Sequence, residues 1–310
     1  MNFFLVSIPT KTNFRGINHR ESVIFEGTQG WSEFSPFLEY SAEEARTWLQ
    51  ASLEAAEKPW PKLYRNKIEV NATLPNVTPD RVSEILSSFD GTSTVKIKVS
   101  DYVIGSKLVA ATLDYLPTAK IRLDVNGSWT LDEAITFLSQ YIQKFGSVFE
   151  YIEQPVATVK ELAQLKAAVN IKIAVDESIR KDLHGEMELL REVADVAIIK
   201  WQPIGGFEAA HRVAERIGLP VVVSSALETG IGISHSAALA ASFEELPFAC
   251  GLGTVSLLET DICSPALVAQ NGFIPVNRVI PDKALLEKYR ASEERYEWWQ
   301  NRLSEIGGVS

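Results

Sequence analysis

Charged side chains recur at the ends of short apolar segments in the middle of the chain. The segment TVKIKV (94–99) carries Lys96 and Lys98 two positions apart, alternating with aliphatic residues. Because side chains alternate between the two faces of a strand, both ammonium groups should point into one cavity. Two like charges on one inward face cost free energy unless negative groups lie nearby. The sequence therefore predicts an acidic cluster opposite these lysines.

The next four segments of this kind also carry charged residues near their C-terminal ends, and one in each segment continues the pattern. These residues are Asp124 in KIRLDVN, Glu153 in FEYIEQP, Asp176 in KIAVDES and Lys200 in ADVAIIKW. Counted from Lys98, the successive spacings are 26, 29, 23 and 24 residues, about one strand and one helix each. The charges should therefore lie at similar heights around one cavity, with lysines on opposite sides of it.

Three converging carboxylates without histidine or cysteine partners form a hard oxygen site. Such a site suits Mg²⁺, bound at roughly 2.1 Å per ligand, and Mn²⁺ can substitute for it. A substrate carboxylate on this metal would have an acidified α-C–H, because proton removal gives an enediolate whose oxygens the metal stabilises. A lysine can remove the proton if nearby positive charge lowers its pKa. Lys96 and the metal would supply that charge to Lys98.

The weaker members of the set have more than one interpretation. A single inward lysine or aspartate often belongs to a structural ion pair, and only five such residues on consecutive strands favour a catalytic site. Asn126 suits either a turn or a hydrogen bond that supports a metal ligand. Glu177 suits a helix start or a surface position, and Arg122 suits an ion pair within the barrel. The histidines lie in a meander, a polar turn and helices, which disfavours them as the base: His19, His184, His211 and His235.

The pattern of elements indicates how these residues could be positioned. From about residue 67, eight short apolar segments, the first at 67–74 and the last at 248–254, alternate with amphipathic helical stretches over roughly 190 residues. This alternation predicts an α/β fold, a (β/α)7β TIM-like barrel, in which chemistry gathers at the C-terminal ends of the strands. An open doubly wound sheet is the alternative. Such a sheet usually begins with a glycine-rich phosphate loop, and none follows residues 67–74.

The two ends of the chain do not follow this alternation. The segments NFFLVSIP, ESVIFEG and WSEFSPF predict an antiparallel meander, and SAEEARTWLQASLEAAE predicts a helix after it. We therefore expect an α+β capping domain at residues 1–66 and the catalytic barrel at 67–262. Residues 263–310 should return to the capping domain.

The composition disfavours several classes of partner. The chain has 310 residues with 30 Lys plus Arg against 40 Asp plus Glu, a net charge of −10, so nucleic acid is not an expected partner. No apolar run approaches the roughly 20 residues of a membrane span, and the start lacks the basic region of a secretory signal. Two cysteines are too few for a disulfide framework. We expect a cytoplasmic protein, a monomer or weak homo-oligomer.

The motifs KIK, DVNGSW, IEQP, AVDES and IIKW, in this order, resemble the enolase superfamily, in its branch with lysines on both sides of the active site. The resemblance covers essentially the whole chain and implies a capping domain joined to a barrel. Within the superfamily, the short length and the segments NFRGINHRE, WSEFSPFLEY, VVVSSALETGIGISH and CGLGTVSLLETDI resemble actinobacterial o-succinylbenzoate synthases of menaquinone biosynthesis. One departure is Gln154, which stands where many relatives have a second acid.

The resemblance implies an activity and a role for each residue. The activity is syn elimination of water from 2-succinyl-6-hydroxy-2,4-cyclohexadiene-1-carboxylate, a small dicarboxylate, to give 2-succinylbenzoate. Lys98 would take the α-proton and return it to the departing hydroxyl, Lys96 would assist, and Lys200 would stabilise the enediolate from the opposite face. The implied Mg²⁺ ligands are Asp124, Glu153 and Asp176, and the implied substrate contacts are Ser224, Ser225, Gly251 and, in a closing loop, Arg15.

Two other kinds of function stay open at this point. N-acylamino-acid racemases, dipeptide epimerases and muconate-type cycloisomerases use the same scaffold and lysines, so the catalytic residues do not distinguish among them. The capping loop around residues 11–20 and the last two strands favour the synthase. A catalytically silent barrel that binds a partner is the non-enzyme alternative, which the intact set of acids and lysines disfavours. A histidine-dependent dehydratase of the mandelate racemase type fails, because no histidine ends strand six or seven.

Overall fold

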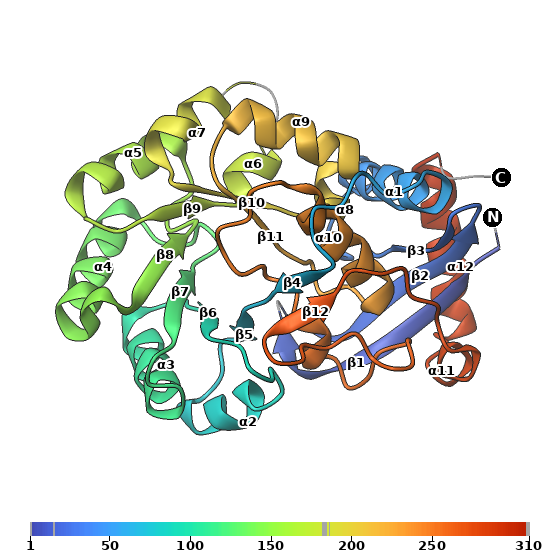
Figure 1. The fold of residues 1–310 in the computed structure, drawn as a ribbon, viewed down its shortest axis with the longest axis horizontal. Coiled ribbons are helices and arrows are strands. Elements are labelled where there is room, and N and C mark those ends of the chain that lie inside the picture. Colours follow the sequence, from blue (N-terminus) through green and yellow to red (C-terminus); the bar gives the residue numbers. More distant parts are fainter. Residues whose placement is uncertain (1, 15, 182–184, 186, 308–310) are drawn as a thin grey trace.

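The computed structural model describes residues 2–14, 16–181, 185 and 187–307. The N-terminal part is a three-stranded antiparallel sheet followed by a helix, as the sequence predicts (Figure 1). Its elements are β1 (Phe4–Phe14), β2 (Ile17–Gly27), β3 (Gly30–Phe34) and α1 (Ala42–Glu57). Ser41 and Glu44 form a capping box that satisfies backbone N–H groups at the start of α1.

Seven parallel strands form the second part, and each adjoins the next along the chain in the order β11-β10-β9-β8-β7-β6-β5. An order without reversal is that of a barrel and not of a doubly wound sheet. The strands are β5 (Ala72–Leu74), β6 (Thr94–Lys98), β7 (Lys120–Asp124), β8 (Phe149–Glu153), β9 (Ile173–Val175), β10 (Val196–Ile199) and β11 (Val221–Val223).

An eighth segment joins the two edges of this sheet. Cys250 forms a parallel bridge with Val70, and Gly251 forms one with Ser224. The backbone N–H of Gly251 donates to Val223 O at 2.9 Å. The strand predicted at residues 248–254 is therefore reduced to two bridging residues, which nevertheless link the last strand to the segment before the first.

The first predicted barrel strand, residues 67–74, is wrong in its extent. It divides into β4 (Lys67–Glu69), which pairs antiparallel with β12 (Phe273–Pro275), and β5, which belongs to the barrel. The break occurs at Asn71, whose N–H donates to Cys250 O while its side-chain amide donates to Ala72 O. The backbone thus changes partners between the two short strands.

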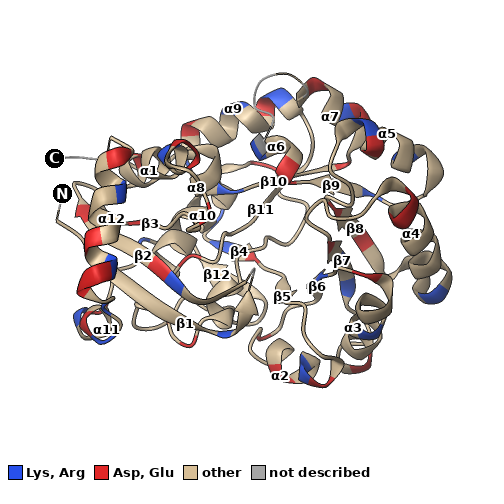
Figure 2. Cartoon of the chain, turned by 180° about the vertical axis from the view of Figure 1, so that it is seen from behind, with Lys and Arg blue, Asp and Glu red and all other residues tan. Residues whose placement is uncertain are grey.

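Helices cover the outside of the barrel (Figure 1). They are α2 (Val82–Leu86), α3 (Tyr102–Tyr115), α4 (Leu131–Phe145), α5 (Val159–Ala168), α6 (Glu177–Lys181), α7 (Met187–Val193), α8 (Trp201–Ile204), α9 (Phe207–Ile217) and α10 (Gly230–Ser242). Charges of both signs mix on outer helices such as α5, α9 and α12 (Glu293–Glu305) (Figure 2). Among the residues described above, no helix is long and apolar enough to cross a membrane.

The C-terminal helices α11 (Lys283–Lys288) and α12 follow the barrel in the chain. The N–H of Ala291, just before α12, donates to Leu5 O of β1 at 2.9 Å. Trp299 of α12 packs edge-on against Phe34 of β3, with ring centroids 5.7 Å apart. The end of the chain therefore lies against the N-terminal sheet. We propose the division 1–66, 67–262 and 263–310 on these contacts.

Candidate active site

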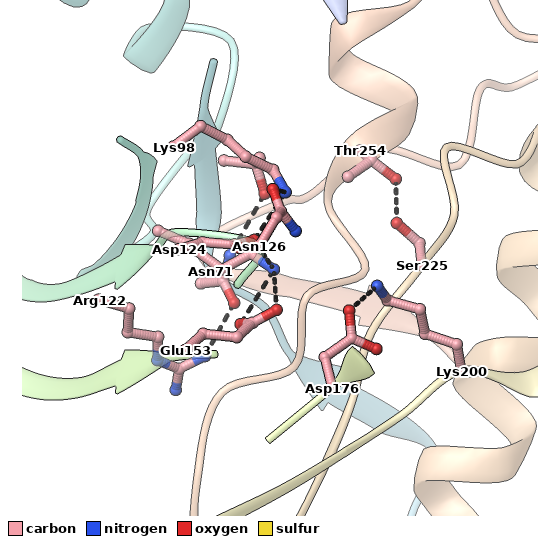
Figure 3. Close-up of polar contacts among 12 residues, drawn as sticks. Asn71, Lys98, Arg122, Asp124, Asn126, Glu153, Asp176, Lys200, Ser225 and Thr254 are labelled. Atoms are coloured by element: carbon pink, nitrogen blue, oxygen red, sulfur yellow. Dashed lines mark hydrogen bonds and ion pairs between the residues drawn. The ribbon is translucent and has the colours of Figure 1, made fainter. Parts of the chain in front are cut away.

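The charged residues singled out in the sequence lie together at one end of the barrel (Figure 3). Lys98, Asp124 and Glu153 end the neighbouring strands β6, β7 and β8, and they stand opposite one another in the strand register. Asp176 follows β9 directly, and Lys200 follows β10. Their side chains thus meet at the C-terminal ends of five consecutive strands.

The negative partners of the inward lysines are carboxylates of the next two strands. Lys98 Nζ donates to Asp124 Oδ2 at 2.7 Å, and Lys96 Nζ lies 3.1 Å from the same oxygen and 3.2 Å from Glu153 Oε1. Burial alone would lower the pKa of Lys96, but the charges of Glu153 and Asp124 outweigh it and raise that pKa above its ordinary value. Lys96 therefore stays cationic beside Lys98, as its expected supporting role requires.

The pKa values of the three acids shift in different directions because their neighbours differ. Burial and the negative charge of Asp124 raise the pKa of Glu153 to about 7, although Lys96 opposes the change. For Asp124, burial is outweighed by Lys98 and Lys96, which hold its pKa below the usual range. Three buried carboxylates this close carry more negative charge than the interior tolerates without cationic partners.

The opposite side of the site is built on Asp176. Lys200 Nζ donates to Asp176 Oδ2 at 2.6 Å, and Arg180 Nε donates to Asp176 Oδ1 at 3.1 Å. Burial of Asp176 is offset by these two cations, which lower its pKa. Arg180 is not among the residues predicted from the sequence. Its position four residues after Asp176, on a helix that follows the strand, is the spacing at which an i,i+4 ion pair forms and could have indicated it.

Asn126 and Glu177 connect the two sides. Asn126 has φ +54°, so it makes the turn, and its Oδ1 also accepts from Lys98 Nζ at 3.0 Å. Its Nδ2 donates to Glu177 Oε1 at 3.2 Å. Asn126 therefore makes a turn, and its side chain bonds to Lys98 and Glu177. Its support of a metal ligand stays a prediction. Glu177 begins α6 as expected, but its side chain is held at the rim of the site.

Gln154 stands where the resemblance to the family implies a second acid, and its side chain makes contacts that need an amide. Its side chain is fully buried, and its Oε1 accepts from the N–H groups of Asp176 at 3.2 Å and Ser178 at 3.1 Å. Its Nε2 donates to Val156 O at 2.9 Å and to Ser178 Oγ at 2.8 Å. A carboxylate could accept the first pair of bonds but could not donate the second. The amide therefore fixes the backbone that carries Asp176.

A cavity lies between the charged cluster and the N-terminal part of the chain. Its empty space amounts to about 500 Å³, part of which is open to solvent. Its polar lining includes Lys96, Lys98, Asn126, Arg180, Lys200, Ser224, Ser225, Gly251 and Thr254. An aromatic wall comes from the first 50 residues and consists of Phe14, Phe37, Tyr40 and Trp48. This wall is not predicted from the sequence, because no motif distinguishes these aromatic residues from core residues.

The residues expected to bind substrate border the same cavity, apart from one. Ser225 Oγ lies 2.6 Å from Thr254 Oγ1 (Figure 3). A Cβ at Gly251 would lie 2.4 Å from Ser224 Oγ, so the close approach of these two segments requires glycine. Arg15 lies outside the described residues.

The histidines do not compete with lysine as the base. His211 bonds to Ser242 Oγ, and His235 is buried between Trp60 and the carbonyl of Trp31. Burial lowers the pKa of His235 to about 3. Neither these two nor His19 lines the cavity, and His184 lies outside the described residues.

The donor set fits a divalent cation. Asp124 Oδ1 is buried without a hydrogen-bond partner, and Asp124 and Asp176 both raise the pKa of Glu153 through their negative charge. A cation among the three oxygen donors would relieve this repulsion. The donor atoms are of the right kind for the cation, but they are not already arranged around a common centre. Within the described ranges, no three acidic, histidine or cysteine side chains already form a metal cluster, since their oxygens contact lysines and Arg180.

Two family models match the chain. Residues 5–56 match the enolase N-terminal domain-like family, and residues 82–282 match the enolase C-terminal domain-like family. The first covers the N-terminal sheet and most of α1, and the second covers most of the barrel.

Curated relatives match over nearly the full length. The o-succinylbenzoate synthase of Thermobifida fusca is 43% identical over 303 residues, which covers 96% of this chain and 93% of that protein. The o-succinylbenzoate synthases of Mycolicibacterium smegmatis and Mycobacterium tuberculosis are each 39% identical, covering 96–97% of this chain and 92–93% of theirs.

Solved structures share the fold. The muconate lactonizing enzyme of Pseudomonas fluorescens aligns with a TM-score of 0.78 at 19% identity, covering 94% of this chain and 98% of that one. The L-Ala-D/L-Glu epimerase of Bacillus subtilis aligns with a TM-score of 0.75 at 22% identity, covering 90% and 96%. At these identities the structures support the architecture, and the curated relatives identify the family. The chain belongs to the o-succinylbenzoate synthase family of the enolase superfamily.

Proposed function

We propose that this chain is an o-succinylbenzoate synthase that removes water from 2-succinyl-6-hydroxy-2,4-cyclohexadiene-1-carboxylate. The observation that carries the proposal is the arrangement of Lys98 and Lys200, which line one cavity and each contact a buried carboxylate. Full-length relatives with this name support the choice of substrate over those of racemases, epimerases and cycloisomerases. The product would be 2-succinylbenzoate, for menaquinone synthesis.

We assign Asp124, Glu153 and Asp176 as the residues that would hold a divalent cation. Enzymes of this superfamily generally depend on a divalent metal, and oxygen donors alone suit Mg²⁺, with Mn²⁺ as a substitute. When bound, the cation would polarise the substrate carboxylate and stabilise negative charge that develops on it.

The chain's own lysines would carry the proton. In its amine form, Lys98 takes the proton from ring carbon C1, and the C–H electrons form the C1–C6 double bond. The same ammonium then returns the proton to the hydroxyl that leaves C6, so that one water is released and the ring becomes aromatic. The Lys200 ammonium stabilises the developing charge from the other side, and Lys96 adds positive charge.

The remaining cavity residues would orient the substrate. Ser224, Ser225 and Gly251 lie where hydroxyl and backbone N–H groups can meet a carboxylate of the succinyl chain. Arg15, which lies between β1 and β2 in the sequence, would pair with the second carboxylate. Excluding water from the aromatic side of the cavity would strengthen these charged contacts.

The test is loss of the cyclohexadiene absorbance when purified protein meets the substrate, with Mg²⁺ and then with EDTA. Fast, EDTA-sensitive loss is expected. A folded, Mg²⁺-loaded protein that leaves the absorbance unchanged but racemises N-succinylamino acids would refute the assignment in favour of a racemase.

We also propose a cytoplasmic location, since Cys250 and Cys263 are buried free thiols. We further propose a monomeric or weakly oligomeric state.

A further inference from the structure

A second, wider groove borders the catalytic cavity on its outer side. It runs between the start of α1 and the rim of the barrel, and its lining includes Glu43, Glu44 and Glu177. Five residues line both spaces, so they form the wall between them: Tyr40, Trp48, Asn126, Arg180 and Pro203. Any substrate that enters from this side must pass that wall.

Arg180 is the charged member of the wall, and its guanidinium binds three different partners. Nε donates to Asp176 Oδ1 at 3.1 Å, and Nη2 donates to Glu177 Oε1 at 3.1 Å. Nη1 donates to the Tyr40 hydroxyl oxygen at 3.3 Å. The side chain is only 14% exposed. A planar fork of donors can hold three partners in fixed directions, which a lysine ammonium on a flexible stem does less well.

The contacts of Arg180 form a bridge between Tyr40 and Asp176. At the Tyr40 end of this bridge, the side chain and backbone are held by other residues. The Tyr40 ring packs against Phe37 and Trp48, with centroids 5.9 and 5.7 Å apart. Its backbone carbonyl accepts from Arg302 Nη2 of α12 at 2.5 Å. A contact to Tyr40 is therefore a contact to the whole N-terminal part of the molecule and not to a loose side chain.

The other end of the bridge is the proposed metal and lysine site. Asp176 is fully buried and uses its second oxygen to accept from Lys200. Arg180 thus fixes one Asp176 oxygen while Lys200 binds the other. Through Glu177 and Asn126, the same network reaches Lys98 on the far side.

We propose that Arg180 is a positioning residue that holds Tyr40 of the N-terminal part with one N–H group and Asp176 with another, so that one guanidinium both closes the cavity wall and orients this carboxylate. The inference rests on the proposed function for the identity of the substrate. The expected effect on metal affinity does not depend on the proposed function, because it follows from the orientation of Asp176 alone.

Two variants separate the two ends of the bridge. Tyr40→Phe keeps the aromatic packing but removes the acceptor, so KM should rise roughly tenfold while kcat and Mn²⁺ affinity stay within twofold. Arg180→Met removes both ends, so Mn²⁺ affinity, measured by EPR titration, should fall roughly ten- to hundredfold, with KM at least as high as in Tyr40→Phe. For Arg180→Lys, KM and Mn²⁺ affinity should both lie between the values of the wild type and of Arg180→Met.

The matched control is Arg81→Met, which breaks an exposed pair with Glu84 on α2 and should leave both quantities unchanged. Circular dichroism and thermal unfolding establish that each variant is folded. Unchanged KM in Tyr40→Phe, unchanged Mn²⁺ affinity in Arg180→Met, or full rescue by Arg180→Lys would each overturn the bridge. If the wild type fails to dehydrate the substrate, the proposed function fails, while the Mn²⁺ titrations still decide the role of Arg180.

Discussion

Lys98 Nζ and Asp124 Oδ2 are 2.7 Å apart, so the proposed base is hydrogen-bonded to a proposed metal ligand. The same oxygen also lies 3.1 Å from Lys96 Nζ. Removing Lys98 therefore leaves Asp124 with a second cationic partner. This redundancy allows the catalytic contribution of Lys98 to be separated from its contribution to folding.

Replacement of Lys98 by alanine should abolish turnover without unfolding the protein. A positioned general base contributes typically 10²–10⁴-fold, so kcat for dehydration should fall by about three orders of magnitude. Thermal unfolding and Mn²⁺ affinity should remain close to wild type, because Lys96 still neutralises Asp124. Lys58→Ala, which breaks an exposed pair with Glu208, is the control and should retain full activity. A kcat for Lys98→Ala within tenfold of wild type would eliminate Lys98 as the base.

Divalent metal should stabilise the folded protein as well as activate it. A ligand that binds only the folded state at 100 times its Kd adds about 2.7 kcal/mol to the free energy of unfolding. Calorimetry should therefore show a higher Tm with Mg²⁺ than with EDTA. In Asp176→Asn this difference should shrink, because one of three carboxylates is lost. Equal Tm values for the wild type with and without Mg²⁺ would speak against a metal among these acids.

The sequence predicts the barrel and the level of its charged residues because both follow from periodic patterns. One charge per strand–helix unit is visible in the spacing from Lys98 to Lys200. Strand lengths were less predictable. Asn71 divides one apolar run into two strands that pair in different sheets, and the eighth strand consists only of the bridging residues Cys250 and Gly251. Closure of the sheet depends on long-range pairing, which no local pattern encodes.

The site was predicted less completely than the fold. Site residues at the ends of barrel strands can be recognised in the sequence, because each is a charged residue in an apolar segment, as Asp124 is. Residues of the aromatic wall, such as Tyr40 and Trp48, come from another part of the chain and carry no such mark. Arg180 lies in a short helix where a solvated arginine is equally common. Its role can be inferred only from the structure, in which it bonds to both Tyr40 and Asp176.

Gly251→Ala should restrict the cavity by a local steric effect. The added Cβ would lie 2.4 Å from Ser224 Oγ, closer than real contacts allow, so the serine side chain or backbone must move into the site. KM should rise by an order of magnitude or more. In a Ser224→Ala background the clash with Oγ disappears, so the same glycine substitution should cost less. Additive effects of the two substitutions on KM would show that this contact does not shape the site.

Gln154→Glu should destabilise the protein, because the buried side chain uses its amide both to accept and to donate. The carboxylate keeps the two N–H bonds but has no N–H to donate, so Val156 O loses its buried donor, while the Ser178 hydroxyl can turn and donate to the new oxygen. The loss at Val156 O costs roughly 1–3 kcal/mol. Denaturant unfolding should show a lower midpoint, and Mn²⁺ affinity should change because Asp176 N–H is held by the same side chain. Gln50→Glu, on the exposed side of α1, is the control and should unfold at the wild-type midpoint. A wild-type midpoint for Gln154→Glu would show that the donors are dispensable.

Glu228 should make stability decrease as the pH rises towards neutrality. It is fully buried, and burial together with the negative charge of Glu33 raises its pKa from 4.5 to about 7, although Arg20 opposes this. Between these values the folded protein holds a proton that the unfolded chain has released. The free energy of unfolding therefore falls from about pH 4.5 to about pH 7 and then levels off, by roughly 3 kcal/mol at most.

Glu228→Gln isolates this contribution from the other acids. The amide can still accept from Ala226 N–H, which Glu228 Oε2 binds at 2.6 Å, while its NH₂ group replaces Oε1, which has no hydrogen-bond partner. The variant lacks the titrating proton, so its stability relative to wild type should increase from pH 5 to pH 8 in denaturant unfolding. Glu294→Gln, an exposed carboxylate on α12, should follow the wild-type curve. Parallel curves for Glu228→Gln and wild type would mean that Glu228 releases its proton at the same pH in the folded and unfolded chains.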